Sequence, residues 1–573
     1  MRGAVLLGLV AAVAWGAPPP RQQFCGTSAS LADELRALQT RREESARAGR
    51  GAARAPYTSV HGDLIVMDSR DEIFVNPQLF DHGLTSLVFE PVAGEPMRYR
   101  VQRYASEIDA RTVTSGRRIL LGDDDAAEVE LPFAFPFFGR QYRTIFLNSD
   151  GNLTFERPDT SMAARNLARF TAGPPRIAPL FLDLDPRRSS GVYVRQLGGG
   201  VAFTWLDVPL WDKGGAGALQ TFQVVMWSWG AIEFHYALHF GMREVVIGIA
   251  PGGDPGRVSF LRPREWQAQE AENAMAERFT AEPGLDIYTA AQRVLDEHPD
   301  VYDYLVFFNT LGVDAAPGAI AYALTLHQEA DGIGRPVYDL RPDIGLNGTL
   351  KTLINMGPLR QYPEDPTQAA GLRPGWPDDA LTILTHEAGH LSLAFPRFRV
   401  EEGFNPYPLL ASDGAHWSHL LETDASIMDG GKLAEVAPGR FRVEAVGRHF
   451  SALDLYFWGM LPASETPGTF WVEPGEGEFF PGVRYLLRVG EEFGGNRRDV
   501  SIDEIIAQTG ARLPGPEGSQ RTFRFAFVVI TADGNPPAPG DLEKLERIRT
   551  AFPAFFHAAT QGHASARTEL GIE

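Results

Sequence analysis

The chain has a single cysteine, Cys25, among its 573 residues. One thiol cannot close a disulfide within the chain, so stability must come from burial and from any bound metal. Positive charge is also scarce, because 53 Lys and Arg stand against 73 Asp and Glu, a net charge of −20. This balance argues against nucleic acid or anionic lipid as a partner, since both require a broad basic face.

Long apolar runs are missing as well. The apolar run Ala4 to Trp15 follows Arg2 and ends in small residues, which is typical of a secretory signal peptide at residues 1–17. It is too short to span a bilayer comfortably, and no later stretch approaches 18 uninterrupted apolar residues. We therefore expect a secreted protein, extracellular or periplasmic, without a membrane span.

Composition divides the remaining chain into segments. Hydrophobic residues make up 44% of the full sequence, with 36 Phe, so most of the chain should be globular. Its length of 573 residues suggests two to four folding units. We predict a multidomain protein in which an antiparallel β-sandwich precedes an α+β domain. The expected segments are a flexible leader or pro-segment at 18–55, the sandwich at 56–265, a helical connector at 266–280 and the α+β domain with a C-terminal extension at 281–573.

Apolar periodicity predicts the main elements of the α+β domain. We expect helices at 287–296, 378–394, 452–460 and from 541 onward, and strands at 304–309, 320–326, 350–355 and 522–530.

The strongest local motif is His386-Glu387-Ala388-Gly389-His390, an HExxH sequence within the predicted helix 378–394. Residues four apart lie about 40° apart around a helix, so both imidazoles can face one Zn²⁺ ion. Glu387 then lies beside the open coordination position, where it can take a proton from water. The pattern predicts a zinc site that hydrolyses peptide bonds.

A catalytic zinc needs a third protein ligand, and His416 is the preferred one. His419 is its main rival. The carboxylates of Glu422, Asp413 or Asp424 are further alternatives, because two histidines and one carboxylate also form catalytic zinc sites.

The HExxH helix, the later His416-Trp417 pair and the turn containing Met428 resemble the metzincin zinc peptidases, particularly the leishmanolysin-like type. The resemblance implies that Met428 lies beneath the zinc ligands as a structural Met-turn. Two positions differ from the family: Leu393 stands where most members have Gly, and Gly430 stands where some have a metal-contacting Tyr. The segments 416–418, 426–428 and 451–456 also resemble a group of uncharacterised secreted bacterial proteins.

The expected substrate is a protein or peptide. Such substrates commonly enter zinc-peptidase clefts as an added β-strand, and 320–326 could supply the edge on which they pair. The alternative is that 320–326 is an internal core strand.

The front segment resembles a nidogen-type extracellular β domain, on the basis of Phe135–Gly139, Phe146–Phe155, Pro179–Pro186 and Thr221–Val225. The resemblance suggests adhesion or positioning. Asp183 and Asp185, or Asp123–Asp125, could contact Ca²⁺, but two alternating carboxylates are more often surface or turn residues, and we expect no calcium there.

Cys25 precedes Gly26 and Thr27, and this Cys-Gly-Thr element resembles one near the start of several secreted zinc peptidases. Its thiolate could occupy the open position of zinc and hold the precursor latent. We thus predict a secreted zinc metalloendopeptidase with Cys25 as a possible latency switch. The alternative is an extracellular binding or adhesion protein whose metal domain is structural or catalytically silent.

Overall fold

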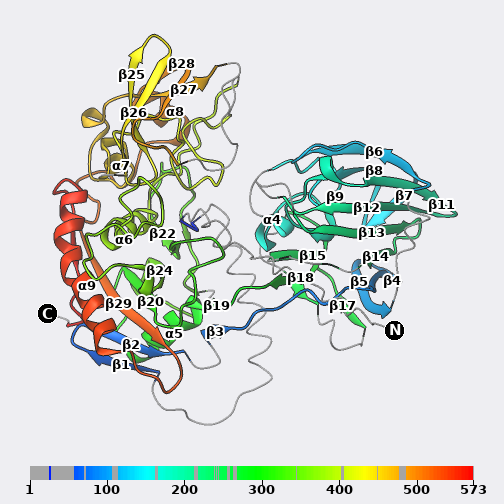
Figure 1. Ribbon diagram of the computed structural model, residues 1–573, viewed down its shortest axis with the longest axis horizontal. Helices are drawn as coiled ribbons and strands as arrows, with labels where there is room; N and C mark the ends of the chain where they lie inside the picture. The colour runs from blue at the N-terminus through cyan, green and yellow to red at the C-terminus, as the bar shows by residue number, and fades with distance from the viewer. Residues whose placement is uncertain are drawn as a thin grey trace, which may run out of the picture.

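The computed structural model describes fifteen stretches of the chain. They are residues 25–27, 57–69, 73–105, 114–161, 165–211, 217–237, 239, 242, 244–253, 258–261, 268–342, 345–401, 406–447, 449–475 and 486–571. The predicted signal peptide at 1–17, and the predicted leader apart from 25–27, lie outside these described residues. Two bodies lie side by side in Figure 1, and the short antiparallel pair of β3 (Phe74–Val75) and β19 (Gly284–Leu285) lies between them.

The body at the left of Figure 1 is built on a seven-stranded mixed sheet. The pairs β2 with β29, β29 with β20 and β20 with β24 are parallel, whereas β1 and β21 run antiparallel to their neighbours. In spatial order the strands are β1 (Thr58–His61), β2 (Leu64–Asp68), β29 (Thr522–Thr531), β20 (Tyr304–Asn309), β24 (Thr352–Pro358) and β21 (Tyr322–Thr325), with β30 (Ser565–Arg567) paired to β29.

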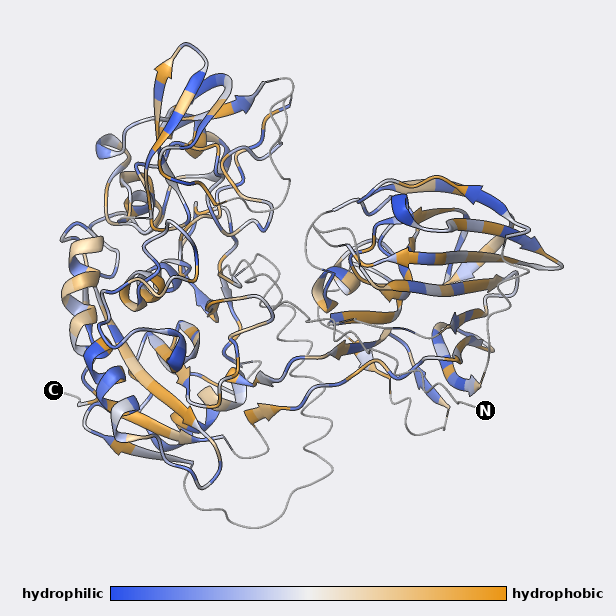
Figure 2. Cartoon of the chain, in the orientation of Figure 1, coloured by the Kyte–Doolittle hydropathy of each residue, from blue (hydrophilic) through white to orange (hydrophobic). Residues whose placement is uncertain are grey.

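Helices cover both faces of this sheet. In β29, Phe525 and Phe527 point into one apolar cluster while Ala526 and Val528 point into another, as expected when side chains alternate along a strand. The first cluster includes α6 (Ala380–Gly389) and α9 (Pro539–Ala559), and the second includes α5 (Ile287–Glu297). Figure 2 shows the strongly hydrophobic character of these central strands. The fold is therefore a helix, sheet, helix arrangement with α6 inside the core.

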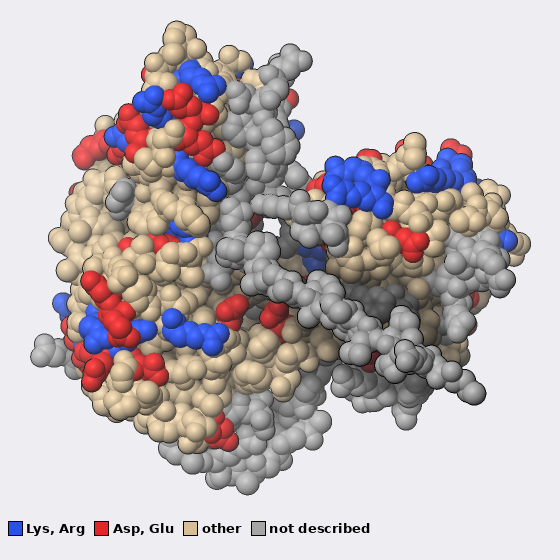
Figure 3. Space-filling view, viewed as in Figure 1, with Lys and Arg blue, Asp and Glu red and all other residues tan. Residues whose placement is uncertain are grey.

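A smaller four-stranded antiparallel sheet adjoins this body at the top of Figure 1. Figure 3 shows Lys and Arg mixed with Asp and Glu over this region, and ion pairs such as Arg442 with Glu492 join them. Its order is β25 (Gly431–Ala437), β26 (Arg440–Val446), β28 (Glu492–Val500) and β27 (Thr469–Pro474). Along the chain, α7 (Ala452–Phe457) and η4 (Ala463–Glu465) lie between β26 and β27, and α8 (Ile502–Thr509) follows β28. In the larger sheet, η3 (Leu359–Gln361) follows β24, and the antiparallel pair β22 (His327–Gln328) and β23 (Tyr338–Asp339) follows β21.

The second body is a β-sandwich, as predicted. Aromatic residues from both sheets, among them Phe135 and Trp205, fill one common core. One sheet has the order β16 (Val258–Phe260), β18 (Ala274–Thr280), β15 (Glu244–Ala250), β10 (Arg176–Phe181), β9 (Asn152–Thr154), β8 (Arg140–Asn148) and β7 (Ala126–Phe137), with α4 (Leu167–Ala172) beside it. The other has β17 (Gln269–Ala271), β5 (Glu95–Ala105), β4 (Thr85–Val92), β14 (Ile232–Tyr236), β13 (Leu219–Trp227), β12 (Gly200–Pro209), β11 (Gly191–Leu197) and β6 (Arg117–Ile119); η1 (Pro186–Arg188) precedes β11.

Two predicted boundaries are wrong. The expected helical connector at 266–280 contains strands β17 and β18, because Met275 and Phe279 point into the sandwich core while Ala274 and Ala276 face the opposite cluster. The sandwich also does not begin at residue 56, since β1 and β2 belong to the seven-stranded sheet. The sandwich is therefore inserted between β2 and α5 of the other body.

Most elements predicted in the second half of the chain are confirmed, with shifted ends. The largest change concerns the HExxH helix, which was expected to reach residue 394 but ends at Gly389. Among the described residues, no helix combines the length and apolar character that crossing a membrane would require.

Candidate metal centre

Helix α6 carries His386, Glu387 and His390 in the interior of the protein. Asp379 caps its first turn, because its carboxylate accepts hydrogen bonds from the backbone N–H groups of Leu381 and Thr382. All ten helical residues are buried. His390 follows the last helical residue but keeps right-handed helical backbone angles, so the two histidines retain their one-turn spacing.

Two hydrogen bonds tie the end of α6 to the sheet below it. The Tyr304 hydroxyl of β20 donates to the Ala388 carbonyl at 3.1 Å, and the Thr325 hydroxyl of β21 donates to the His390 carbonyl at 3.1 Å. Carbonyls at the end of a helix have no partner within it, so these side chains satisfy them and fix the helix end.

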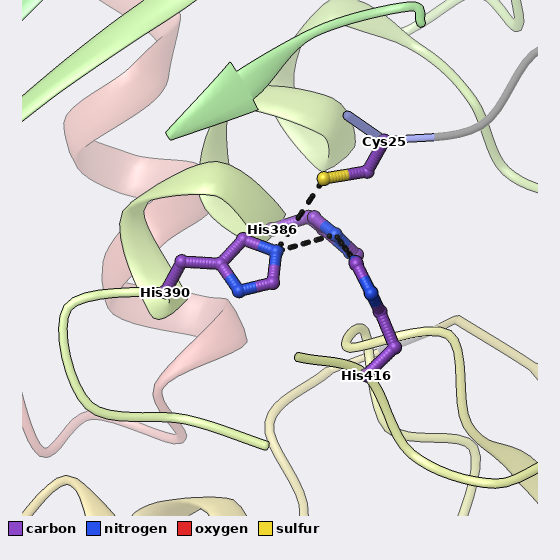
Figure 4. A group of neighbouring side chains, drawn as sticks. All are labelled: Cys25, His386, His390 and His416. Atoms are coloured by element: carbon purple, nitrogen blue, oxygen red, sulfur yellow. Dashed lines mark hydrogen bonds between the residues drawn. The ribbon is translucent and has the colours of Figure 1, made fainter. Parts of the chain in front are cut away.

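His416 lies against the two helix imidazoles. Its Nε2 is 3.2 Å from His386 Nε2, which is in turn 3.2 Å from His390 Nε2. Figure 4 shows the three rings converging from α6 and from the loop that carries His416. The structure thus brings together the three residues predicted to bind zinc.

The rival ligands lie elsewhere. His419 is not part of this cluster. Glu422 accepts hydrogen bonds from the backbone N–H groups of Asp424 and Leu433, and Asp424 pairs with Lys432 at 3.0 Å. Asp413 contacts His416 itself rather than joining the cluster, because its Oδ2 lies 3.0 Å from His416 Nδ1.

Hydrogen bonds on the outer ring nitrogens fix the tautomers. His386 Nδ1 lies 2.7 Å from the Ile427 carbonyl, and His416 Nδ1 lies 3.0 Å from the Asp413 carboxylate. Both partners only accept, so each Nδ1 carries the proton, and a neutral ring then has a lone pair on Nε2. Burial lowers the pKa of His386 to about 3, which keeps its ring neutral at pH 7. The Nε2 lone pairs that these tautomers leave on His386 and His416 point at one another, an arrangement that a cation between them would stabilise.

The sulfur of Cys25 completes the cluster. Cys25 Sγ lies 3.4 Å from His390 Nε2, and all four ligand atoms lie within 4.8 Å of one another in a buried site (Figure 4). Tetrahedral zinc with Zn–N near 2.05 Å and Zn–S near 2.3 Å requires N···N separations of about 3.4 Å and N···S separations of about 3.6 Å. The nearest measured separations, 3.2 and 3.4 Å, are close to these values. The donor set therefore fits zinc.

Met428 lies directly beneath α6. It is fully buried, and a Cβ atom added at Gly389 would stand only 2.7 Å from its sulfur. The glycine inside the HExxH motif thus leaves room for Met428. The same turn supplies the Ile427 carbonyl that orients His386. It therefore supports the cluster both by packing Met428 under the helix and by fixing the ring of His386.

The backbone has a specific local geometry at Leu393 and Gly430, the two positions singled out in the sequence. Ala394, one residue after Leu393, has a positive φ of 60°, so a left-handed turn occurs there without glycine. A Cβ atom at Gly430 would stand 2.1 Å from Thr423 Oγ1, so this backbone has no room for a tyrosine.

Three short motifs meet at Asp454. Trp417 Nε1 donates to Asp454 Oδ1 at 2.8 Å, and Ser451 forms a capping box with Asp454 at the start of α7. The hydroxyl of Ser426 also bonds to this carboxylate. The buried Asp454 therefore joins the His416 loop, the Met428 turn and α7 into one support.

Sequence reasoning missed the role of Thr27. Its hydroxyl lies 3.2 Å from Glu387 Oε2, and Ala323 N in β21 donates to it at 2.8 Å. Gly26 N donates to the Ala321 carbonyl at 2.7 Å. Residues 25–27 thus lie along β21, which is an edge strand among the described strands. This position decides between the two alternatives that the sequence left open for 320–326, an edge strand and an internal core strand. The Cys-Gly-Thr element was the only sequence signal for this contact.

The acidic residues of the sandwich contact arginines. Asp124 and Asp183 lie 2.5 and 3.2 Å from Arg165, and Asp185 lies 2.7 Å from Arg187. Asp123, Asp124 and Asp183 form a second group of neighbouring acids. Their negative charge is paired with the positive charge of the arginines, Asp123 with Arg187 and the other two with Arg165.

Comparisons with known proteins concern the sandwich. Residues 98–283 match the family described as NIDO related. This match supports the predicted nidogen-like character of the inserted body, and it covers strands β17 and β18, where a connector was expected. No curated protein and no solved structure matches the chain. None of the described residues of the NIDO-related region belongs to the histidine cluster.

Proposed function

We propose that the chain is a secreted zinc-dependent endopeptidase with a metzincin-like catalytic domain, into which a NIDO-related sandwich is inserted. The observation that carries the proposal is the set of three Nε2 atoms, in which His386 Nε2 lies 3.2 Å from both of the others. Ile427 and Asp413 hold His386 and His416 so that their Nε2 lone pairs point inward. Burying such a cluster is costly without a cation, and imidazoles with this spacing suit zinc.

Each residue of the cluster has a distinct role in this proposal. His386, His390 and His416 hold the metal, and Met428 supports them from below. Zinc held there would act as a Lewis acid toward water and toward the peptide carbonyl. Glu387, which is fully buried, accepts the proton from the attacking water and delivers it to the leaving nitrogen.

The edge strand β21 is the proposed binding site for the substrate backbone. Ala321, just before the strand, already offers its carbonyl to Gly26, and Ala323 within the strand offers its N–H group to Thr27. A peptide added along this edge would use the same groups, which recognises an extended backbone without selecting particular side chains. The expected substrate is therefore an unstructured protein segment.

Cys25 explains how such an enzyme would be kept inactive before maturation. A catalytic zinc site keeps one coordination position open, whereas Cys25 and the three histidines together supply four protein ligands. We infer that the thiolate of Cys25 takes the position that water needs, and that removal of the leader opens it.

A second function is favoured by the same set of four protein ligands, which leaves no coordination position open. Four protein ligands are typical of structural zinc, and residues 98–283 match a NIDO-related family. In this alternative the chain is an extracellular binding or adhesion protein with a catalytically silent metal domain.

One paired experiment separates these functions. Protein with and without residues 18–55 is tested for bound zinc and for cleavage of an unstructured protein such as casein, alongside Glu387→Gln. The proposal requires zinc in all forms and cleavage only by the shortened protein with Glu387 intact. Zinc without cleavage by the shortened protein would favour the binding function.

Matched histidine variants test the ligand assignment in the same preparation. We expect His416→Ala to lose zinc and cleavage together, while His419→Ala keeps both, because His419 lies outside the cluster. Loss of zinc from His419→Ala alone would overturn the assignment.

A further inference from the structure

Thr27 makes contacts that a metal-binding thiol does not explain. Its side chain is buried, and its hydroxyl oxygen accepts a hydrogen bond from Ala323 N at 2.8 Å. The single hydroxyl proton can reach either Glu387 Oε2 at 3.2 Å or the Ala323 carbonyl at 3.3 Å. One residue of the leader thus contacts both the proposed general base and the proposed substrate strand.

We propose that Thr27 is a second, metal-independent lock on the active site, distinct from Cys25. The hydroxyl of Thr27 hydrogen-bonds to Glu387 Oε2, the oxygen that would otherwise receive a proton from water. The backbone of 26–27 covers the edge of β21. The part of this inference that concerns catalysis rests on the proposed function. The docking itself depends only on the described contacts.

The environment of Glu387 makes this contact strong. The carboxylate is fully buried, and a hydrogen bond is electrostatically stronger in such a low-dielectric interior than in water. A hydroxyl that donates to an ionised carboxylate forms a stronger hydrogen bond than one between neutral groups. The carboxylate that catalysis requires is therefore also what holds the leader in place.

The same segment is anchored at three successive positions. Cys25 Sγ lies beside His390, Gly26 N donates to the Ala321 carbonyl at 2.7 Å, and Thr27 contacts Ala323 and Glu387. The backbone N–H of Thr27 also lies 3.3 Å from Cys25 Sγ and so stabilises a thiolate there. A side chain at position 26 would be tight, since its Cβ atom would stand 2.9 Å from Ala319 Cβ. The contacts of 26 and 27 involve no metal, so they should persist when zinc is removed.

Cys25 itself provides a direct readout, because it is the only cysteine in the chain. Full-length protein is treated with a chelator, and the rate at which Cys25 reacts with a thiol reagent is measured. We expect slow reaction in the wild type and reaction about tenfold or more faster in Thr27→Val, which keeps the shape and loses the hydroxyl. Thr27→Ser, which keeps the hydroxyl, should react nearly as slowly as the wild type. Equal rates for the wild type and Thr27→Val would overturn the proposal.

A double-mutant cycle with Glu387→Ala tests whether Thr27 acts through that carboxylate. The acceleration caused by Thr27→Val should be smaller in the Glu387→Ala background, because one of the two partners is already gone. An undiminished acceleration would show that Thr27 acts only through β21 and would overturn the second lock. Unfolding midpoints of the variants confirm that the rates report docking rather than unfolding.

An activity measurement then separates this inference from the proposed function. In zinc-loaded precursor, Cys25→Ser should remain partly latent, and Cys25→Ser/Thr27→Val should cleave casein about tenfold faster than Cys25→Ser. Full activity of Cys25→Ser alone would reject the second lock while supporting the peptidase. If no form cleaves casein, the proposed function fails, and the thiol rates still decide whether Thr27 docks the leader.

Discussion

Asp413 Oδ2 lies 3.0 Å from His416 Nδ1, on the side of the ring that faces away from the other histidines. Asp413 Oδ1 also accepts a hydrogen bond from Ala415 N at 3.0 Å, so the carboxylate is held by the loop whose histidine it orients. A carboxylate behind a metal-binding imidazole fixes its tautomer and raises its basicity. Asp413 is thus a positioning residue for the proposed zinc site, although its sequence position made it a rival ligand.

We expect Asp413→Asn to weaken zinc binding about 10- to 100-fold, since an amide oxygen is a poorer acceptor and cannot serve both partners equally. Competition with a zinc indicator on protein lacking residues 18–55 measures this affinity. Asp424→Asn is the matched control, because Asp424 contacts Lys432 on the surface. Equal affinities for the two variants would contradict the positioning role.

Gly389→Ala should destabilise the body built on the seven-stranded sheet by about 1–3 kcal/mol, because the new methyl group would stand 2.7 Å from Met428 Sδ and 2.9 Å from Phe450. Gly540→Ala in α9 is the control, since a Cβ atom there meets nothing within 4 Å. Urea unfolding of both variants measures the difference. A double variant that adds Met428→Ala should lose less than the sum of the two single changes, and strict additivity would place the strain elsewhere.

Much of the site could be predicted because its information is local. The four-residue spacing of His386 and His390 fixes their common face on any helix, and the need for a third ligand directs attention to His416. The position of Thr27 could not be predicted in this way, because its contact with Glu387 spans 360 positions and depends on tertiary folding.

The errors in domain boundaries have physical causes too. The Gln, Ala and Glu residues near 270 favour a helix by intrinsic propensity, but burial on both faces of β18 outweighs that preference. Strand β2 reads Leu-Ile-Val-Met, an apolar run typical of a buried parallel strand, yet such a run does not reveal which sheet it joins.

The sandwich should lose stability below neutral pH because of His82. This side chain is fully buried, and burial, followed by the nearby Arg103 charge, lowers its pKa to about 3. The unfolded chain takes up a proton near pH 6.5, whereas the folded chain does not until about pH 3. His82 therefore leaves the free energy of unfolding of the sandwich unchanged above pH 6.5. It lowers this free energy as the pH falls toward 3, by about 2 kcal/mol at pH 5.

Calorimetry of the wild type and His82→Phe at pH 7 and pH 5 checks this expectation. Phenylalanine suits the site, because His82 packs against the aromatic rings of Tyr236 and Phe279. The unfolding midpoint should fall less in the variant than in the wild type between the two pH values. Equal decreases would assign the pH dependence to other groups.

Cutting the chain once between the two bodies should not separate them. A specific protease site inserted at 281–283 would leave β1, β2 and the sandwich on one fragment and β20, β24 and β29 on the other. Strand β2 pairs with β29 along five residues, and Leu64, Ile65 and Met67 are fully buried there. Separation would expose these side chains, at a cost of roughly 1.5–3 kcal/mol each, and would also break the ladder of hydrogen bonds.

We expect the cut fragments to migrate together in native gel filtration and to separate only in denaturant. Separation under native conditions would show that β2 contributes little to holding the bodies together.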